Sequence, residues 1–136
     1  MATIFISYVR EDSGSMEAIL NCKKQDKFLK VEFNSDKLLI DIFKEKDQLT
    51  KSEIEKSLAG LLLKSNAILI LVGNETHNKK WIEWEYNYAQ NNQLRVGLMR
   101  VPNSTGSPHP ILPNLPIENL SLKALKKMIK DWGWVQ

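Results

Sequence analysis

The stretch AILILV, Ala67 to Val72, has no polar residue on either face of an extended chain. A strand with one wet face carries polar residues at every second position, whereas a central strand of a parallel sheet is covered by helices on both sides. Gly73 follows directly and ends the apolar run. The stretch therefore predicts a central parallel strand, and it is far shorter than the roughly 20 residues of a membrane-spanning helix.

Helix and strand patterns flank this strand on both sides. Before it, Thr50 and Glu53 have the spacing of a capping box, which predicts a helix from Thr50 to about Asn66. The apolar face of that helix is expected to consist of Ile54, Leu58, Leu61 and Leu62. After it, KKWIEWEYNYA, from Lys79 to Ala89, predicts a helix, and the run from Leu94 to Val101 predicts the next strand.

The N-terminal part adds two strands and one helix. Thr3 to Ser7 is a short β-rich run, and Met16 to Phe28 is compatible with a helix. Val31 and Phe33 alternate with charged residues, as in a half-buried strand. Asp36 to Gln48 shows no clear period, and we expect a long loop with a helical turn there.

The C-terminal part combines an irregular segment and an amphipathic helix. Pro102 to Pro116 contains all five prolines, which predicts irregular structure with a short edge strand at Ile111 to Leu112. Ser121 is suited to cap a final helix. Its expected apolar face comprises Leu122, Leu125, Met128, Ile129 and Trp132. Such a face suits packing on the sheet, which we favour, or contact with a membrane surface.

The order strand, helix, strand, helix, strand, helix, strand predicts an α/β fold. We expect a flavodoxin-like, open, mostly parallel sheet of about four to five strands, with helices on both faces. A chain of 136 residues is in the range of one compact domain, so residues 1–136 are expected to form a single domain.

Charge and cysteine content restrict the class of protein. The formal net charge of +3 is spread among acidic residues, which favours a small anionic ligand over a nucleic-acid partner. The single cysteine, Cys22, and the lack of a signal-peptide pattern indicate a cytoplasmic protein. His77 and His109 have no partners at ligand spacing, so no metal site is expected.

Polar residues follow each of the first three predicted strands. The carboxyl ends of parallel strands share one edge of the sheet, where ligands bind in open α/β folds. The residues at these three ends are Ser7, Tyr8 and Arg10, then Asn34, Ser35 and Asp36, then Asn74, Glu75 and Thr76. The sequence therefore predicts a polar crevice at this edge.

One carboxylate in the helix after the central strand is a candidate for chemistry. Helical spacing predicts a buried stripe of Ile82, Tyr86 and Ala89, with Trp81, Glu85 and Tyr88 beside it. Glu85 is then expected at the border of the core, next to an indole and with a raised pKa. Glu83 is expected in solvent. The alternative is that Trp81 and Glu85 only anchor the helix, since acids are common in first turns.

Three segments together resemble a known family. They are FISY at Phe5 to Tyr8, I-x-x-S-L with L-L-x-K-S-N-A-I-L-I-L-V-G between Ile54 and Gly73, and N-E-T-x-x-x-x-W-I-x-x-E-x-x-x-A from Asn74 to Ala89. This combination is similar to the bacterial TIR-like family that includes the signal-generating proteins of Thoeris anti-phage systems. The resemblance covers most of Thr3 to Val101 and implies a TIR-like variant of the expected fold.

The resemblance also implies an activity. TIR-type enzymes cleave NAD at the nicotinamide–ribose bond, and their catalytic glutamate follows a tryptophan by four residues, which matches Glu85. Ser7 and Tyr8 match the substrate-lining end of the first strand, Asn34 and Asp36 match the second loop, and Trp81 would wall the pocket.

The implied substrate is NAD, with no separate cofactor. The implied product is an ADP-ribose-derived signal, expected to be cyclic, that would reach a downstream effector by diffusion. The implied partners are further TIR domains, in a homo-oligomer or another TIR–TIR assembly, with neither nucleic acid nor membrane.

Two other classes of protein remain open. A non-catalytic TIR-like interaction module would carry the same Trp and Glu as helix anchors. A phospho-receiver domain has the same sheet topology, and Glu11 and Asp12 imitate its acidic pair, but Gly73 and Asn74 stand where its phosphate-accepting aspartate would be required. A phosphate-cradling glycine motif is missing, which argues against a nucleoside triphosphatase.

Overall fold

The computed structural model describes residues 2–25, 31–35, 50–76, 81–112 and 117–134, and it has a five-stranded parallel sheet. The strand order is β2-β1-β3-β4-β5, with every neighbouring pair parallel. The strands are β1 (Ala2–Ser7), β2 (Val31–Ser35), β3 (Ala67–Val72), β4 (Arg95–Arg100) and β5 (Glu118–Asn119). This order is flavodoxin-like, so the predicted fold class is confirmed.

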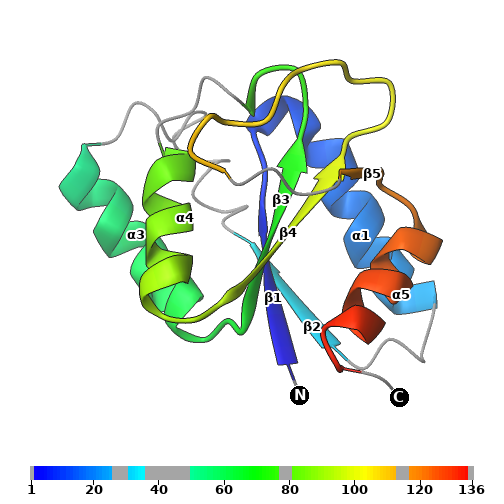
Figure 1. The fold of residues 1–136 in the computed structure, drawn as a ribbon, viewed down its shortest axis with the longest axis horizontal. Helices are drawn as coiled ribbons and strands as arrows, with labels where there is room; N and C mark the ends of the chain where they lie inside the picture. The colour runs from blue at the N-terminus through cyan, green and yellow to red at the C-terminus, as the bar shows by residue number, and fades with distance from the viewer. Residues whose placement is uncertain (1, 26–30, 36–49, 77–80, 113–116, 135–136) are drawn as a thin grey trace.

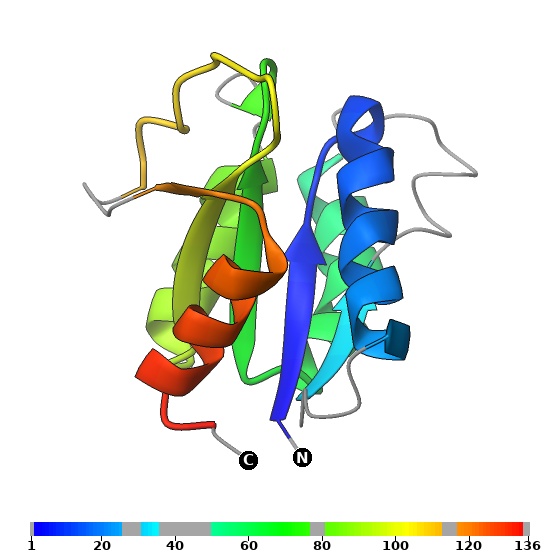
Figure 2. The ribbon, with the colours of Figure 1, turned by 90° about the vertical axis from the view of Figure 1, so that its right-hand side faces the viewer.

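Helices cover both faces of the sheet (Figures 1 and 2). They are α1 (Ser13–Gln25), α3 (Lys51–Leu63), α4 (Trp81–Asn91) and α5 (Leu122–Asp131), with a 3₁₀ turn η1 (Arg10–Asp12) before α1. Helices α1 and α5 pack on one face, and α3 and α4 pack on the other (Figure 1). The three layers bury β3 from both sides, as its composition predicted.

Alternate residues of the strands enter two separate apolar clusters. Along β3, Leu69 and Leu71 face the helices α1 and α5, whereas Ile68 and Ile70 face α3 and α4. All six residues of β3 are fully buried. The two clusters define the two faces of the sheet, and they decide which helix each side chain of β1 and β3 can contact.

Local sequence signals set the ends of two helices. Thr50 caps α3 through a complete capping box with Glu53, as predicted, although the helix ends at Leu63 rather than near Asn66. Ser121 caps α5 by accepting a hydrogen bond from the backbone N–H of Ala124. The segment from Asp36 to Gln48, for which the sequence predicts a long loop with a helical turn, lies outside the described residues.

Two predictions about the C-terminal part were wrong. The edge strand is Glu118–Asn119, whereas Ile111 and Leu112 lie in a turn that is closed by a hydrogen bond from the N–H of Leu112 to the carbonyl of His109. The expected apolar face of α5 included Leu122, but this residue, the first of the helix, is 36% exposed. Leu125 and Ile129 do pack on the sheet, which confirms the favoured role of α5.

Candidate functional site

β1 lies at the switch point of the sheet, because β2 is placed on one side of it and β3 on the other. From β1 the chain moves outward to β2, then returns to place β3 on the other side. In flavodoxin-like sheets the helices diverge at this point and leave a crevice at the carboxyl ends of the strands. Ser7 ends β1 and pairs in register with Ile70, so the carboxyl ends of β1 and β3 lie side by side at the edge of the sheet where such folds bind ligands.

Ser7 and Glu85 meet in the interior of the protein. The hydroxyl of Ser7 donates a hydrogen bond of 2.7 Å to Oε1 of Glu85, and both residues are 0% exposed. Strand alternation explains the contact, because Phe5 and Ser7 point to the same face and Phe5 packs in the cluster of α3 and α4. The structure thus joins the end of β1 to α4 through a buried hydroxyl and a buried carboxyl group.

The buried face of α4 differs from the predicted face. Trp81, Ile82, Glu85 and Ala89 are buried, whereas Tyr86 is only half-buried. Glu85 is therefore not at the border of the core, as the spacing suggested, but inside it. The helix is rotated about its axis relative to the prediction, so that positions 81, 85 and 89 face the sheet. The indole of Trp81 therefore packs in the apolar cluster between the sheet and α4.

The remaining predicted pocket residues are dispersed. Tyr8 is buried in the cluster under α1 and α5, on the face of the sheet opposite to the cluster that contains Trp81. Asn34 is half-buried, and its Oδ1 accepts a hydrogen bond from the backbone N–H of Ser35. Asp36 lies outside the described residues. Within the described residues of the predicted set, a hydrogen bond joins Ser7 to Glu85.

The chain turns after β3, at the carboxyl edge of the sheet. Thr76 is 1% exposed, and its hydroxyl accepts a hydrogen bond from the N–H of Gly73 and donates one to the carbonyl of Leu71. A buried hydroxyl that both donates and accepts in this way replaces two backbone partners. These two hydrogen bonds therefore hold the turn from Leu71 to Thr76 in a defined shape.

Asp12 lies against this turn. In the sequence it was considered only as part of the acidic pair of a phospho-receiver domain. A Cβ atom built on Gly73 would overlap the carboxylate of Asp12, so only glycine leaves room for it. Oδ2 of Asp12 is buried and has no hydrogen-bond partner in the described part of the chain. Burial, followed by the negative charge of Glu11, raises the pKa of Asp12 to about 6. Sequence gave no sign of this contact, because 61 positions separate Asp12 from Gly73.

The raised pKa of Asp12 predicts a pH-dependent stability. The folded protein holds this proton more tightly than the unfolded chain, so the free energy of unfolding falls as pH rises from about 4 to about 6 and is then constant. We expect Asp12→Asn to stabilise the protein by about 1–2 kcal/mol at pH 7 and to flatten this dependence. Urea unfolding between pH 4 and pH 8 measures both effects.

The control for this prediction is Glu11→Gln, which removes an exposed neighbouring carboxylate. It should leave most of the pH dependence in place, because burial is the larger cause of the raised pKa. A profile for Asp12→Asn that keeps the wild-type slope between pH 4 and pH 6 would contradict the assignment.

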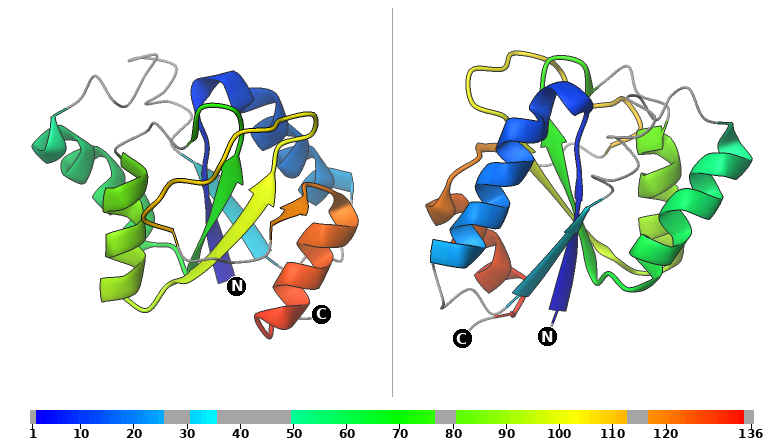
Figure 3. Two further views of the ribbon diagram at one scale, coloured as in Figure 1. Left: turned by 45° about the horizontal axis from the view of Figure 1, so that its top comes forward. Right: turned by 180° about the vertical axis from the view of Figure 1, so that it is seen from behind.

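Residues 102–112, which we call the strap, cross the carboxyl end of β3 (Figure 3). The N–H of Thr105 donates to Oδ1 of Asn74 at 2.8 Å. The hydroxyl of Ser104 shares its proton between the carbonyls of Val101, at 2.6 Å, and Val72, at 3.2 Å. Within the strap, the carbonyl of Gly106 accepts from Nη1 of Arg100 at 2.8 Å. Leu112 then packs in the same apolar cluster as Trp81. The strap thus links the end of β3 to the cluster below α4.

The described residues also bear on metal sites and membrane spans. Among the described residues, no group of three or more His, Cys, Asp or Glu side chains is arranged to hold a metal ion. No helix in the same part of the chain has the length and apolar composition needed to cross a membrane.

Comparison with known proteins identifies the family. Residues 5–106 match the family model described as the TIR-like domain of the Thoeris protein ThsB. No match was found among curated proteins. The matched region extends from β1 into the strap, and so it contains Ser7, the turn after β3 and Glu85. Since the match spans most of the chain, the protein belongs to the family of Thoeris ThsB TIR-like domains.

Proposed function

We propose that this TIR-like domain cleaves NAD at the bond between nicotinamide and ribose, with Glu85 as the catalytic residue. The observation that carries the proposal is the buried contact between Ser7 and Glu85 at the carboxyl end of β1. A carboxylate at the switch point of a flavodoxin-like sheet is placed where such folds bind ligands. The family match includes both residues, which supports a functional site in this region. The reaction itself is our inference.

One carboxylate is sufficient for this reaction. Hydrolysis of an ordinary glycoside needs a second carboxyl group, because the leaving oxygen must be protonated. In NAD the nicotinamide is a cationic pyridinium, so the bond from its nitrogen to ribose C1′ breaks with the electron pair going to nitrogen, and neutral nicotinamide leaves. The positive charge that develops on the ribose is then stabilised by the carboxylate of Glu85.

Ser7 is the positioning residue in this scheme. Its hydroxyl already binds Oε1 of Glu85, which orients the carboxylate before substrate arrives. On binding, ribose hydroxyls would take over or share the role of the Ser7 hydroxyl as donors to the carboxylate. Trp81 lies in the same buried face of α4 and would exclude water from the reacting centre.

The ribosyl cation can be captured in two ways. Water would give ADP-ribose and a proton, whereas a nitrogen of the adenine of the same molecule would give a cyclic ADP-ribose and a proton. We propose the cyclic product, as a diffusible signal in anti-phage defence, because exclusion of water at the buried Glu85 favours capture within the molecule.

The test of the proposal is incubation of the purified protein with NAD, alone and with extract of phage-infected cells. Chromatography should show nicotinamide together with a cyclic or linear ADP-ribose. NAD in excess of its dissociation constant should also raise the melting temperature by mass action. If neither nicotinamide release nor thermal stabilisation occurs under any of these conditions, the proposal is wrong.

The second candidate function is a non-catalytic module for TIR–TIR assembly. The complete burial of Glu85 favours it, because a carboxyl group held by Ser7 inside the core also serves as a helix anchor. Such a module should assemble with a second TIR domain and should show no thermal response to NAD. The thermal measurement therefore separates the two functions even when the enzyme needs a trigger for turnover.

A further inference from the structure

Arg100 ends β4 at the carboxyl edge of the sheet, and its charge is not used in the site described above. Its side chain is half-buried, and its Nη1 donates a hydrogen bond of 2.8 Å to the carbonyl of Gly106. This bond occupies one of the five N–H donors of a guanidinium. Within the described part of the chain, no carboxylate pairs with Arg100. Because a charge that is partly removed from water is costly unless it is paired, Arg100 is suited to bind an anion.

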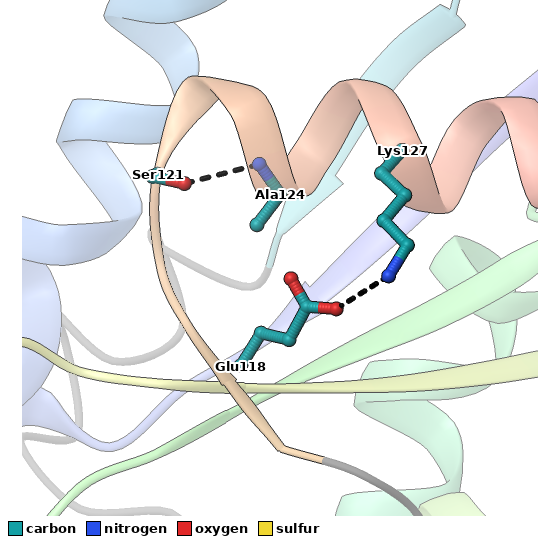
Figure 4. Close-up of polar contacts among 4 residues, drawn as sticks. All are labelled: Glu118, Ser121, Ala124 and Lys127. Atoms are coloured by element: carbon teal, nitrogen blue, oxygen red, sulfur yellow. Dashed lines mark hydrogen bonds and ion pairs between the residues drawn. The ribbon is translucent and has the colours of Figure 1, made fainter.

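Two other cations among the described residues have partners within the protein. Nζ of Lys127 forms an ion pair of 3.0 Å with Oε1 of Glu118, which connects α5 to β5 (Figure 4). Arg95, at the opposite end of β4, lies with its guanidinium carbon 5.9 Å from the centroid of the Trp134 ring, as in a cation–π contact. The protein supplies a partner for both of these charges, whereas Arg100 contacts a neutral carbonyl group.

The side chain of Arg100 faces the same side of the sheet as the candidate site. Leu98 packs in the apolar cluster of α3 and α4, and strand alternation turns Arg100 to the same face. Arg100 also pairs in register with Val72, which belongs to that cluster. Ser7 faces this side as well and binds Glu85 there. The guanidinium and the carboxyl group therefore share one face of the sheet.

The register of the strands gives the spacing between the two groups. Ser7 pairs with Ile70, and Ile70 pairs with Leu98. Arg100 is therefore two strands across from Ser7 and two residues further along, which places their Cα atoms about 12 Å apart. The guanidinium lies closer than this to the end of β3, because a Cβ on its acceptor, Gly106, would overlap the backbone of the turn after β3.

We propose that Arg100 binds the pyrophosphate of NAD while Glu85 acts on the nicotinamide ribose, an inference that rests on the proposed function. The pyrophosphate is attached to C5′ of the ribose whose C1′ carries nicotinamide, so the two groups are separated by one sugar. A guanidinium donates two parallel hydrogen bonds to phosphate oxygens, and Arg100 has donors left for them.

The strap takes part in this site through Gly106. Its carbonyl holds the guanidinium of Arg100 in place before the ligand arrives, so less side-chain freedom is lost on binding. The contact also makes the site selective for nucleotides. Nicotinamide riboside has the same cleavable bond as NAD but no phosphate, and it therefore gains nothing from Arg100.

The test is calorimetric titration of the full chain with ADP-ribose, which contains the pyrophosphate but not the reacting bond, so that turnover is not required. The wild-type protein should bind ADP-ribose saturably. Arg100→Gln should weaken this binding by about tenfold to hundredfold, because the charge-assisted hydrogen bonds are lost. Arg100→Lys keeps the charge and a donor for Gly106 but not the planar fork, and should weaken binding by about threefold to tenfold.

Arg95→Gln is the matched control. It makes the same substitution in the same strand and removes the same charge, but at the exposed amino end of β4. The affinity for ADP-ribose should remain within about twofold of the wild-type value, because Arg95 is roughly 16 Å from Arg100 along the strand.

Turnover separates phosphate binding from support of the strap. For NAD, Arg100→Gln should raise KM about tenfold or more and leave kcat nearly unchanged, since the lost contact is made in the ground state and the transition state alike. For nicotinamide riboside, kcat/KM should be the same in Arg100→Gln and the wild type. A purely structural role of Arg100 through Gly106 would instead lower kcat/KM for both substrates by the same factor.

Three results would overturn the inference: no saturable binding of ADP-ribose to the wild-type protein up to millimolar concentration, wild-type affinity in Arg100→Gln, or equal losses with NAD and nicotinamide riboside. The outcome for NAD cleavage is separate. If ADP-ribose binding depends on Arg100 but NAD is never cleaved, the phosphate contact stands and the proposed reaction fails. If NAD is cleaved and Arg100→Gln retains the wild-type KM, the reaction stands and the role of Arg100 fails.

Discussion

Glu85→Gln is expected to lower the rate of NAD cleavage by about 10³-fold without unfolding the protein. Glutamine has the same size, and its amide oxygen can still accept the hydrogen bond from the Ser7 hydroxyl. What it lacks is the negative charge that stabilises the ribosyl cation. The rate is measured as nicotinamide release under the conditions in which the wild-type protein is active, and thermal unfolding confirms that the fold is retained.

Ser7→Ala is the matched variant for this experiment. It removes the 2.7 Å hydrogen bond but leaves the carboxylate, so we expect a smaller loss, about tenfold in kcat. The order of the two effects distinguishes a catalytic carboxylate from a structural one. If Glu85→Gln cleaves NAD at the wild-type rate, or if Ser7→Ala is the more damaging variant, Glu85 is not the catalytic residue.

The elements that sequence predicted well are those in which one strong local signal decides the outcome. A strand with the sequence AILILV buries all of its side chains only when both of its faces are covered, and β3 has that position. Thr50 and Glu53 satisfy the first backbone N–H groups of a helix, and α3 begins there. The edge strand was misplaced because Glu118 and Asn119 have no β-rich pattern. They are extended through pairing with Met99 and Arg100, which is a tertiary effect.

In the candidate site, too, local signals were predicted from sequence and tertiary contacts were not. Spacing placed Glu85 near Trp81, and the resemblance selected Glu85 and Ser7 from many polar residues. Helical spacing alone could not show how far α4 is rotated, and the expected position of Glu85 at the core border was therefore wrong. The contact of Asp12 with Gly73 depends on the register of β1 and β3 and on the path of η1, neither of which has a local signature.

The strap provides the second large effect, a loss of stability in Gly106→Ala. A Cβ on Gly106 would overlap the carbonyl oxygen of Gly73 and lie 2.7 Å from Cα of Asn74, both of which are backbone atoms. Backbone atoms cannot rotate away as a flexible side chain can. Either the turn after β3 shifts, or the strap lifts and loses its hydrogen bonds to Asn74 and Val72.

Both responses of Gly106→Ala lead to a similar cost. Overpacking a well-filled site costs about 1–3 kcal/mol, and each lost hydrogen bond costs about 0.5–1.5 kcal/mol. We therefore expect the free energy of unfolding in urea to fall by about 1–3 kcal/mol. The amide of Thr105 should also exchange faster, because its acceptor on Asn74 is lost when the strap lifts.

Gly60→Ala is the matched control, since the same methyl group is added where nothing lies within 4 Å. Gly60 lies inside α3, and alanine there should stabilise the protein by about 0.5–1 kcal/mol through its higher helix propensity. The two variants should therefore change stability in opposite directions. Equal stability of Gly106→Ala and the wild type would mean that the strap does not rest on the turn after β3.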